Sequence, residues 1–509
     1  MAKQRRRAAV VGAGPNGLAA AIKLATHDID VTLVESRSST GGGLRSSRPF
    51  RSGSLVDDCS GFHPLAMASP FFTSLEQRGI GLATVGVEFA HPAVVVGHPL
   101  DDGDGGILLR SVVETAERLG PDATTWRRVF EPLADNVDAM LNLALRPLTA
   151  AHPKDFVAAR AFVIRAAMPA NAISLLFRTS RARALLSGIS AHTLSPLWWP
   201  LSAAGGLLLA TVGQTYGWPV VVGGSGSIAR GLSRIATELG VTIITDQRID
   251  RLADVEKLAG VDTGRGDLVF LDTSPRAALG IVDGRQRRAD AAAYRRFRHG
   301  PGAFKVDFDL RGDIPWTNPE LASAGTVHLG GTWREVSGAE ISVWRGCVSE
   351  QPYVLLGQQY VADPQRLGRV GGDLTRPVWT YAHVPHGSSK DALPALLRQV
   401  ERFAPGFQDL IVDMRVRTPA DLEDGNANYV GGDIGGGAND ALQLIRRPKA
   451  FSPYATGVAG VFLCSASTPP GGGVHGMGGY NAVDAALREG RREGGVRRLC
   501  GPTRAPYRC

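Results

Sequence analysis

The sequence lacks several features that define whole classes of protein. It has no run of about 18 apolar residues, the length that a membrane-spanning helix needs, although 44% of its residues are hydrophobic. Its five cysteines, Cys59, Cys347, Cys464, Cys500 and Cys509, form no CxxC pair and no metal-binding spacing. No basic patch interleaved with aromatic residues indicates nucleic-acid binding. We therefore expect free thiols in a reducing, cytoplasmic setting, without a metal site, a membrane span or a nucleic-acid partner.

An excess of positive charge is concentrated in a few places. The formal net charge is +8, and arginines cluster at 5–7, 285–298 and after 488. Solvated surface is the simpler interpretation, and peripheral attraction to anionic lipid is the alternative. Arginines 5–7 stand before an apolar run as in a signal peptide, but that run contains a glycine motif of another kind, so we expect no signal peptide.

That glycine motif is the first strong indication of function. An apolar strand at 8–12 leads to Gly12, Gly14 and Gly17, a helix is predicted at 15–25, and a second strand at 31–34 ends in Glu35. In dinucleotide-binding proteins the glycines let the backbone approach a pyrophosphate, and the acid binds ribose hydroxyls. NAD and FAD share this pattern, so the motif alone does not distinguish them.

The residues that follow favour FAD. Positions 38–46 form a second glycine turn that ends in Arg45, a cation placed to reach the same pyrophosphate. A nicotinamide domain would continue with alternating strands and helices, whereas 57–72 is a mixed stretch that contains His63.

The end of the chain carries a matching element. A strand at 461–463 runs into a loop dense in glycine, and the loop runs into a helix. Such a loop directs backbone N–H groups and a helix N-terminus at a ligand. These two elements lie about 450 residues apart in the sequence. Together they suggest one large cofactor that is held by both ends of the chain.

The middle of the chain changes texture twice. Residues 110–187 show helical periodicity, and the apolar stretch 203–212 predicts a buried helix or the wall of an apolar pocket. A second strand–loop–helix–strand unit at 220–252 and a strand at 267–273 fit the cofactor domain. From Phe304 onward the residues alternate as in strands, which predicts a separate sheet in a substrate domain; 428–437 is a loop that needs positive φ at several positions.

These motifs together resemble the phytoene desaturase/dehydrogenase-related superfamily of FAD-dependent oxidoreductases. The resemblance is closest to the branch of pyridine nucleotide-disulfide oxidoreductase domain-containing proteins. It rests on motifs in one order along nearly the whole chain, among them VVGAGPNGLAAA, STGGGLRS, GWPVVVGGSGSIARGL, NANYVGGDIGGG and LCSASTPPGGGVHGMGGYNA. It implies an α/β fold of the amine-oxidase and phytoene-desaturase type, with a discontinuous Rossmann-like FAD domain and a mixed-sheet substrate domain under a helical cap.

The motifs and the resemblance select the candidate site residues. The predicted FAD-binding residues are Gly12, Gly14, Pro15, Asn16, Gly17, Glu35, Ser36, Gly42, Gly43, Leu44, Arg45, Ile249, Thr273, Ser465, Gly476 and Met477. His475 and His63 are the candidates for proton exchange beside the flavin, with a structural role as the alternative for each. Tyr381, His383 and His386 read as structural, and His192 reads as a core histidine.

We therefore expect a two-domain FAD enzyme. The FAD domain comprises residues 1–72, 218–285 and 450–509, and the substrate domain comprises 73–217 and 286–449. The expected reaction is hydride transfer from a substrate C–H bond to flavin N5, on a small, apolar molecule, with oxygen, a quinone or another electron acceptor. A flavin-dependent isomerase without net redox chemistry and an FAD-containing assembly protein are the alternatives. Homo-oligomers are possible partners.

Overall fold

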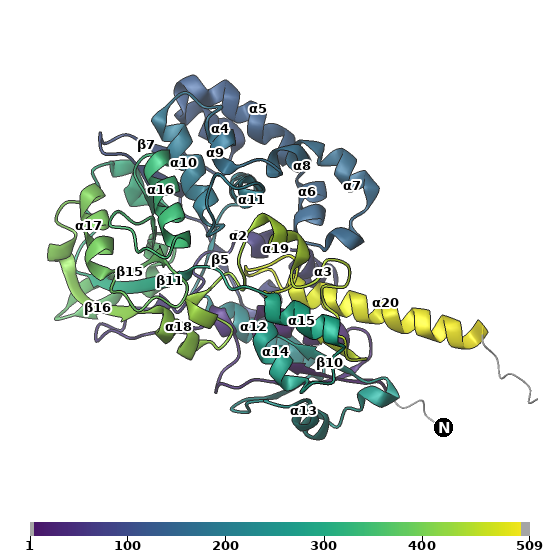
Figure 1. The fold of residues 1–509 in the computed structure, drawn as a ribbon. Coiled ribbons are helices and arrows are strands. Elements are labelled where there is room, and N and C mark those ends of the chain that lie inside the picture. Colours follow the sequence, from purple (N-terminus) through teal and green to yellow (C-terminus); the bar gives the residue numbers. More distant parts are fainter. Residues whose placement is uncertain (1–4, 500–509) are drawn as a thin grey trace, which may run out of the picture.

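Two large sheets, each with helices against it, make up most of the fold, and the described residues also form two small two-stranded sheets. A computed structural model describes residues 5–499, and their side chains up to residue 490 (Figure 1). One sheet holds both ends of the chain and the other holds strands from its middle. Cys59, Cys347 and Cys464 are free thiols, whereas Cys500 and Cys509 lie outside the described residues. No helix in the described part is long and apolar enough to cross a membrane.

The first sheet is parallel and has five strands in the described part of the chain. Its order is β17-β10-β1-β2-β9. The three central strands are mostly apolar and are covered on both faces, as expected for a parallel sheet. The strand bounds are Arg7–Val11 for β1, Asp30–Val34 for β2, Thr242–Ile244 for β9, Leu268–Leu271 for β10 and Val461–Leu463 for β17.

Helix α1 lies at the centre of this half of the molecule. Proline at the first helical position, Pro15, starts the helix directly after the glycine turn, and Gly12 adopts a left-handed φ of 97°. On one side α1 contacts α12, and on the other it contacts the C-terminal helix α20, whose N–H at Gly478 donates to Asn16 Oδ1 at 3.1 Å. The helices of this half are α1 (Pro15–Ala25), α12 (Gly226–Glu238), α13 (Leu252–Ala259), α14 (Pro275–Ile281), α15 (Arg288–Arg296) and α20 (Met477–Leu499).

The second sheet is mixed. Its order is β16-β11-β15-β13-β12-β6-β7, with β14 paired to β15, and all pairs on this path except β12 with β6 are antiparallel. Helix α17 packs on one face and α10 on the other. The bounds are β6 (Val94–Pro99), β7 (Gly105–Leu108), β11 (Gly302–Leu310), β12 (Ala324–Leu329), β13 (Val354–Gly357), β14 (Gly368–Val370), β15 (Asp373–Val384), β16 (Ile411–Arg417), α10 (Ser180–Ala191), α16 (Trp333–Trp344) and α17 (Leu393–Phe403).

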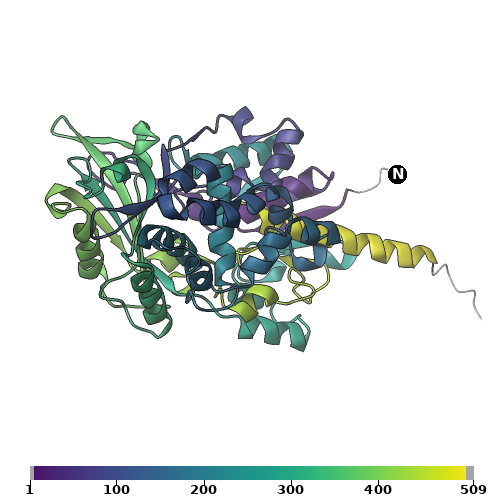
Figure 2. The ribbon, with the colours of Figure 1, turned by 90° about the horizontal axis from the view of Figure 1, so that it is seen from above.

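A layer of helices from residues 112–215 lies above the junction of the two halves (Figure 1). Seen from above, the mixed sheet lies at one end of the molecule, and α20 extends from the opposite end (Figure 2). These helices are α4 (Val112–Arg118), α5 (Ala123–Ala134), α6 (Val137–Ala144), α7 (Pro153–Ala158), α8 (Arg160–Ala166), α9 (Ala170–Ser174) and α11 (Ser202–Thr215). The apolar stretch 203–212 therefore lies within a helix, as the sequence predicts.

Two details differ from the sequence-based expectation. The strand at Val220–Val221, β8, pairs with β5 (Phe89–Ala90) instead of joining the parallel sheet. Of the second predicted unit, only β9 joins that sheet, where it pairs with β2 at the edge. The mixed sheet also recruits β6 and β7 from a region where the sequence indicated no strands. Short elements complete the fold: β3 (Ser46–Ser47), β4 (Val56–Asp57), α2 (Pro64–Met67), α3 (Pro70–Gln77), α18 (Pro419–Gly425) and α19 (Ala441–Arg446).

The close contact between α1 and α20 predicts that a side chain at Gly479 would destabilise the protein. A Cβ at Gly479 would lie 1.9 Å from the carbonyl oxygen of Asn16, and neither backbone can yield without shifting a helix. We expect Gly479→Ala to destabilise the protein by about 1–3 kcal/mol, the usual cost of overpacking. Gly338→Ala, in the exposed part of α16 with nothing within 4 Å of the new Cβ, is the control and should be neutral or slightly stabilising. Urea unfolding of both variants measures the difference, and equal stabilities would contradict the close packing.

Candidate cofactor and substrate cavity

A cavity of about 1180 Å³ lies at the carboxyl ends of the parallel strands. Residues after β1, β2 and β10 line one part of it, and residues of the mixed sheet line another. Ligands of open α/β sheets bind at this edge of the sheet. The cavity therefore joins the dinucleotide-type turn to the second sheet.

The glycine turn and Glu35 lie together at one side of the cavity. Glu35 Oε2 accepts the Ala13 N–H at 2.9 Å, and Oε1 accepts the Arg37 N–H at 2.9 Å. Oε1 also accepts longer hydrogen bonds from the Ser36 hydroxyl at 3.3 Å and Arg45 Nη2 at 3.4 Å, so Oε2, with one donor, is the oxygen that retains capacity for a ligand hydroxyl. The predicted residues found on this wall are Gly12, Gly14, Pro15, Asn16, Glu35, Ser36, Ile249 and Thr273.

Gly17 does not line the cavity. Its hypothetical Cβ would lie 1.9 Å from the Gly12 carbonyl oxygen, so this glycine permits the tight turn instead of contacting a ligand directly. Leu44 is likewise fully buried in the core beside the second glycine turn and is absent from the wall. Gly17 and Leu44 therefore pack beneath the cavity wall and do not form part of it.

The second glycine turn brings a cation to the same wall. Gly42, Gly43 and Arg45 line the cavity. Arg45 Nη2 lies 3.4 Å from Glu35 Oε1 and donates to the Ser39 carbonyl oxygen at 2.8 Å. The guanidinium is therefore held beside the acid, and its contact with a phosphate stays a prediction.

Asp272, directly after β10, is a cavity residue that the sequence analysis missed. Its Oδ2 accepts the Gly17 N–H at 3.0 Å, and the Gly14 N–H also bonds to it. Burial, reinforced by the charge of Glu35, raises the pKa of Asp272 to about 7, although the two backbone hydrogen bonds oppose the shift. A buried acid thus ties the end of β10 to the start of α1.

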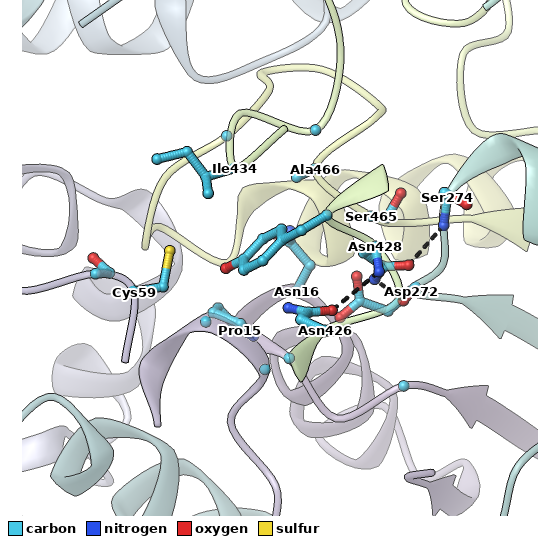
Figure 3. A pocket seen from close by; sticks show the side chains of 18 of the residues that line it. Pro15, Asn16, Cys59, Asp272, Ser274, Asn426, Asn428, Ile434, Ser465 and Ala466 are labelled. Atoms are coloured by element: carbon cyan, nitrogen blue, oxygen red, sulfur yellow. Dashed lines mark hydrogen bonds between the residues drawn. The ribbon is translucent and has the colours of Figure 1, made fainter. Parts of the chain in front are cut away.

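A loop from the other half of the molecule crosses the cavity next to this acid. Asn428 Nδ2 donates to the Asp272 carbonyl oxygen at 2.9 Å, and its Oδ1 accepts the Ser274 N–H at 2.8 Å. Figure 3 shows Asn428 beside Asp272, with a dashed line to Ser274, and Asn426 beside Pro15. The sequence marked 428–437 as a loop with positive φ, but gave no sign that it reaches the dinucleotide-type turn.

The C-terminal loop forms a further wall, with corrections to three predicted contacts. Ser465 lines the cavity together with Ala466 and residues 472–474. Met477 and Gly476 do not, because Met477 is buried at the start of α20 and a Cβ at Gly476 would meet Phe71 and Ala19. His475 also lies off the cavity, since its Nδ1 accepts the Met477 N–H at 3.0 Å. Its Nε2 is buried without a partner among the described residues, and its role stays a prediction.

His63 does lie on the cavity wall. Its Nε2 is 2.8 Å from the Ser225 hydroxyl, and the side chain is 1% exposed. Burial lowers the pKa of His63 to about 4, while Asp57 opposes the shift. The imidazole is therefore neutral at physiological pH.

The far end of the cavity is formed by the mixed sheet and the helical layer. Thr326 of β12, Leu355 of β13, and Trp379 and Tyr381 of β15 line it from the sheet. His192, after α10, lines it from the helices, so the expectation of a core histidine is corrected. His383 and His386 do not line it: His383 Nδ1 contacts Glu340 at 2.7 Å, and His386 bonds to the Gly300 carbonyl oxygen.

The donor set fits a dinucleotide with an attached ring system. An acid at the end of β2, N–H groups at the start of α1 and an arginine lie along one part of the cavity, and aromatic and apolar residues form the other. Pro15 has no N–H, and Asp272 accepts those of Gly14 and Gly17, so within the first turn of α1 the Asn16 N–H is the donor left for an anion. The volume is ample for a molecule of that size.

Comparison with known sequences agrees with this geometry. A family model described as an NAD(P)-binding Rossmann-like domain matches residues 10–67. Pyridine nucleotide-disulfide oxidoreductase domain-containing protein 2 of Mus musculus is 37% identical over 92 residues, which are 18% of this chain and 16% of that protein. An uncharacterized protein of Mycobacterium tuberculosis is 24% identical over 94% of this chain and 96% of its own length.

Solved structures share the whole fold. An oxidoreductase from Methanosarcina mazei superposes with a TM-score of 0.59 at 12% identity, covering 95% of this chain and all of its own. A putrescine oxidase bound to putrescine superposes with a TM-score of 0.56 at 16% identity, covering 96% and 99%. These matches confirm the predicted Rossmann-like and mixed-sheet fold and the resemblance to oxidoreductase domain-containing proteins.

Asp272 gives a prediction for the apo-protein. The pKa of Asp272 is about 7 in the native state, whereas the ordinary value is 3.8. Between pH 3.8 and pH 7 the native protein therefore keeps a proton on Asp272 that the unfolded chain has released. Stability from this group is therefore present at low pH and is lost as pH rises towards 7, by at most about 1.4 kcal/mol per pH unit. We expect Asp272→Asn to become more stable relative to wild type as pH rises from 5 to 7.

Urea unfolding at several pH values measures this change. Asp254→Asn, which removes an exposed carboxyl from α13, is the matched control. A stability difference between Asp272→Asn and wild type that did not grow with pH would show that Asp272 is ionised in the native state throughout.

Proposed function

We propose that this protein is an FAD-dependent oxidoreductase that transfers a hydride from a substrate C–H bond to the flavin. One observation carries the proposal: a single cavity connects the Glu35 and glycine-turn wall with an aromatic wall on the mixed sheet. A dinucleotide site alone would not need the second wall. FAD, when bound, supplies the hydride-accepting ring.

The chain's own residues have defined tasks in this proposal. Glu35 would accept hydrogen bonds from the adenosine ribose, and the start of α1 with Arg45 would hold the pyrophosphate. Residues 465–474 and His63 would lie along the flavin part of the cavity. The loop that carries Asn426 and Asn428 bonds to Asp272 and Ser274 and would form part of the wall around the cofactor.

The division of the chain belongs to the same proposal. Residues 1–72, 218–285 and 450–509 would form the FAD domain, of which 1–4 and 500–509 lie outside the described residues. Residues 73–217 and 286–449 would form the substrate domain. The proposed setting is the cytoplasm, with at most peripheral membrane contact.

The substrate is proposed to be a small molecule with a lipophilic part, since Leu194, Leu209 and Trp218 line the far end of the cavity. Electrons would pass on to oxygen, a quinone or another acceptor. The structurally similar putrescine oxidase carries an amine substrate, which adds amines to the candidates.

Exchange of Glu35 tests the cofactor part of the proposal. We expect Glu35→Gln to bind FAD about 10- to 150-fold more weakly, because a hydrogen bond to a charged group contributes about 1.5–3 kcal/mol. The amide oxygen keeps an acceptor for the buried Ala13 N–H, and only the bond from the part-buried Arg37 N–H is lost, so the fold should persist. Glu238→Gln, at the exposed end of α12, is the control, and fluorescence of released FAD is the measurement. Equal retention in both variants would remove Glu35 from the site.

Anaerobic reduction tests the chemistry. Holoprotein is mixed with small-molecule extracts of its host cells, fractionated by polarity, and flavin absorbance is recorded. We expect one fraction to bleach the flavin, and oxygen or a quinone to restore the colour. If a fraction is altered by the protein without bleaching or any acceptor, the isomerase alternative holds. If no fraction is altered, the role as an assembly protein holds.

A further inference from the structure

The far end of the cavity carries a set of polar groups that the cofactor does not explain. Successive pairings align residues across the mixed sheet: His328 of β12 lies opposite Leu355 of β13, and Leu355 lies opposite Tyr381 of β15. The next row aligns Thr326, Gly357 and Trp379. Alternate residues of a strand face the same side of a sheet, so these side chains share one face.

Two polar side chains, Tyr381 from the sheet and His192 from the helical layer, face the cavity with a group that has no protein partner in the described part of the chain. Tyr381 is 6% exposed and lines the cavity, and among the described residues its hydroxyl makes no hydrogen bond. His192, which is partly buried, also lines the cavity, and its Nδ1 likewise has no partner in the described part of the chain. Thr326 Oγ1 and Trp379 Nε1 of the same wall are buried without a partner, and each such group costs about 1–3 kcal/mol. Their occurrence together indicates a ligand that supplies the missing partners.

A second imidazole, that of the buried His328, contacts the ring of His192. His192 Nε2 lies 2.9 Å from His328 Nε2, so one ring donates and the other accepts. The His192 ring also meets the edge of Trp218 at 5.3 Å between ring centroids, which fixes its plane. Burial lowers the pKa of both histidines, that of His192 to about 3, so both rings are neutral at physiological pH and His192 Nδ1 has an unprotonated lone pair that can accept a hydrogen bond.

We propose that this end of the cavity binds a substrate whose reacting carbon carries a hydroxyl or a neutral amine, and that His192 accepts the proton of that group while Tyr381 holds its heteroatom. The proposal rests on the proposed function, because the flavin is the oxidant. The C–H bond breaks with its electron pair leaving as hydride to the flavin. The O–H or N–H bond breaks with its proton passing to His192 Nδ1, and the electrons left behind form C=O or C=N.

His328 orients His192. With the shared hydrogen on His192 Nε2 donated to His328 Nε2, the Nδ1 of His192 is the ring nitrogen left to accept the substrate's proton. Burial and the neighbouring histidines hold the pKa of His328 well below its ordinary value, so the proton stays on His192. A hydrocarbon polyene, which has no such proton, would leave both His192 and Tyr381 unpartnered. The site therefore favours alcohol or amine oxidation over formation of a C=C bond.

Matched probes test this substrate class in the holoprotein. 4-Phenylbutylamine, 4-phenylbutan-1-ol and butylbenzene share an apolar body and differ in the polar end, and their binding is followed by perturbation of the flavin spectrum. We expect the amine or the alcohol to bind about tenfold more tightly than butylbenzene, since two neutral hydrogen bonds contribute about 1.4 kcal/mol or more. Under anaerobic conditions the preferred probe should also bleach the flavin.

Variants assign the two roles. Tyr381→Phe should abolish the preference for the polar probe and leave butylbenzene binding unchanged. His192→Gln should slow bleaching about 10²–10⁴-fold, the usual effect of losing a general base, with FAD content unchanged. His386→Gln, a histidine away from the cavity, is the control for both measurements.

Several results would overturn the proposal. These are butylbenzene binding as tightly as the polar probes, no binding of either polar probe, binding without bleaching, or variants that behave like His386→Gln. If His192→Gln loses FAD, His192→Asn is measured in its place, and unchanged bleaching in it also overturns the assignment. A protein that contains no flavin fails the proposed function instead, which the absorbance spectrum reveals before any probe is added.

Discussion

The close packing of backbone around helix α1 is the constraint on which the rest of this structure depends. There is no space for a Cβ at two glycines. A Cβ on Gly17 would lie 1.9 Å from the Gly12 carbonyl oxygen, and a Cβ on Gly479 would lie 1.9 Å from the Asn16 carbonyl oxygen. The first contact forms the turn, and the second brings the C-terminal helix against it. Because both depend on glycine, no other residue can occupy these two positions without moving the turn that faces the cavity.

The same region concentrates polar groups that would be unfavourable in an ordinary core. Asp272 is buried against two backbone N–H groups near the Glu35 carboxylate, and Asn428 from the other half bonds to the Asp272 backbone. Each contact joins segments far apart in the sequence. The cavity wall is thus built by the convergence of several chain segments on one turn, which explains why a large cofactor would be held from several directions.

Much of the fold could be predicted from the sequence because local patterns encode it. The strand, glycine turn, helix and acid around Gly12 and Glu35 lie within one continuous segment, and α1 occupies Pro15–Ala25 as the sequence predicts. The strand–loop–helix order at the C-terminus follows the same logic. By contrast, Asp272 has a signal only as a polar residue after a strand. Its contact with Gly17 depends on how the β1 and β10 strands pair, which no local pattern records.

Side-chain roles at the substrate end were the least predictable. His192 follows a buried helix in an apolar stretch, and only the tertiary structure places it beside His328 and the cavity. His475 shows the reverse: a histidine in a glycine-rich loop suggests catalysis, yet its ring caps the N–H of Met477.

The central claim is that both halves of the chain enclose FAD. It is tested most directly by releasing the bound small molecule from purified full-length protein and identifying it by mass spectrometry with quantitation. The account predicts FAD in a one-to-one ratio with the chain. Release of a nicotinamide dinucleotide, or failure of the protein to bind added FAD, would contradict it.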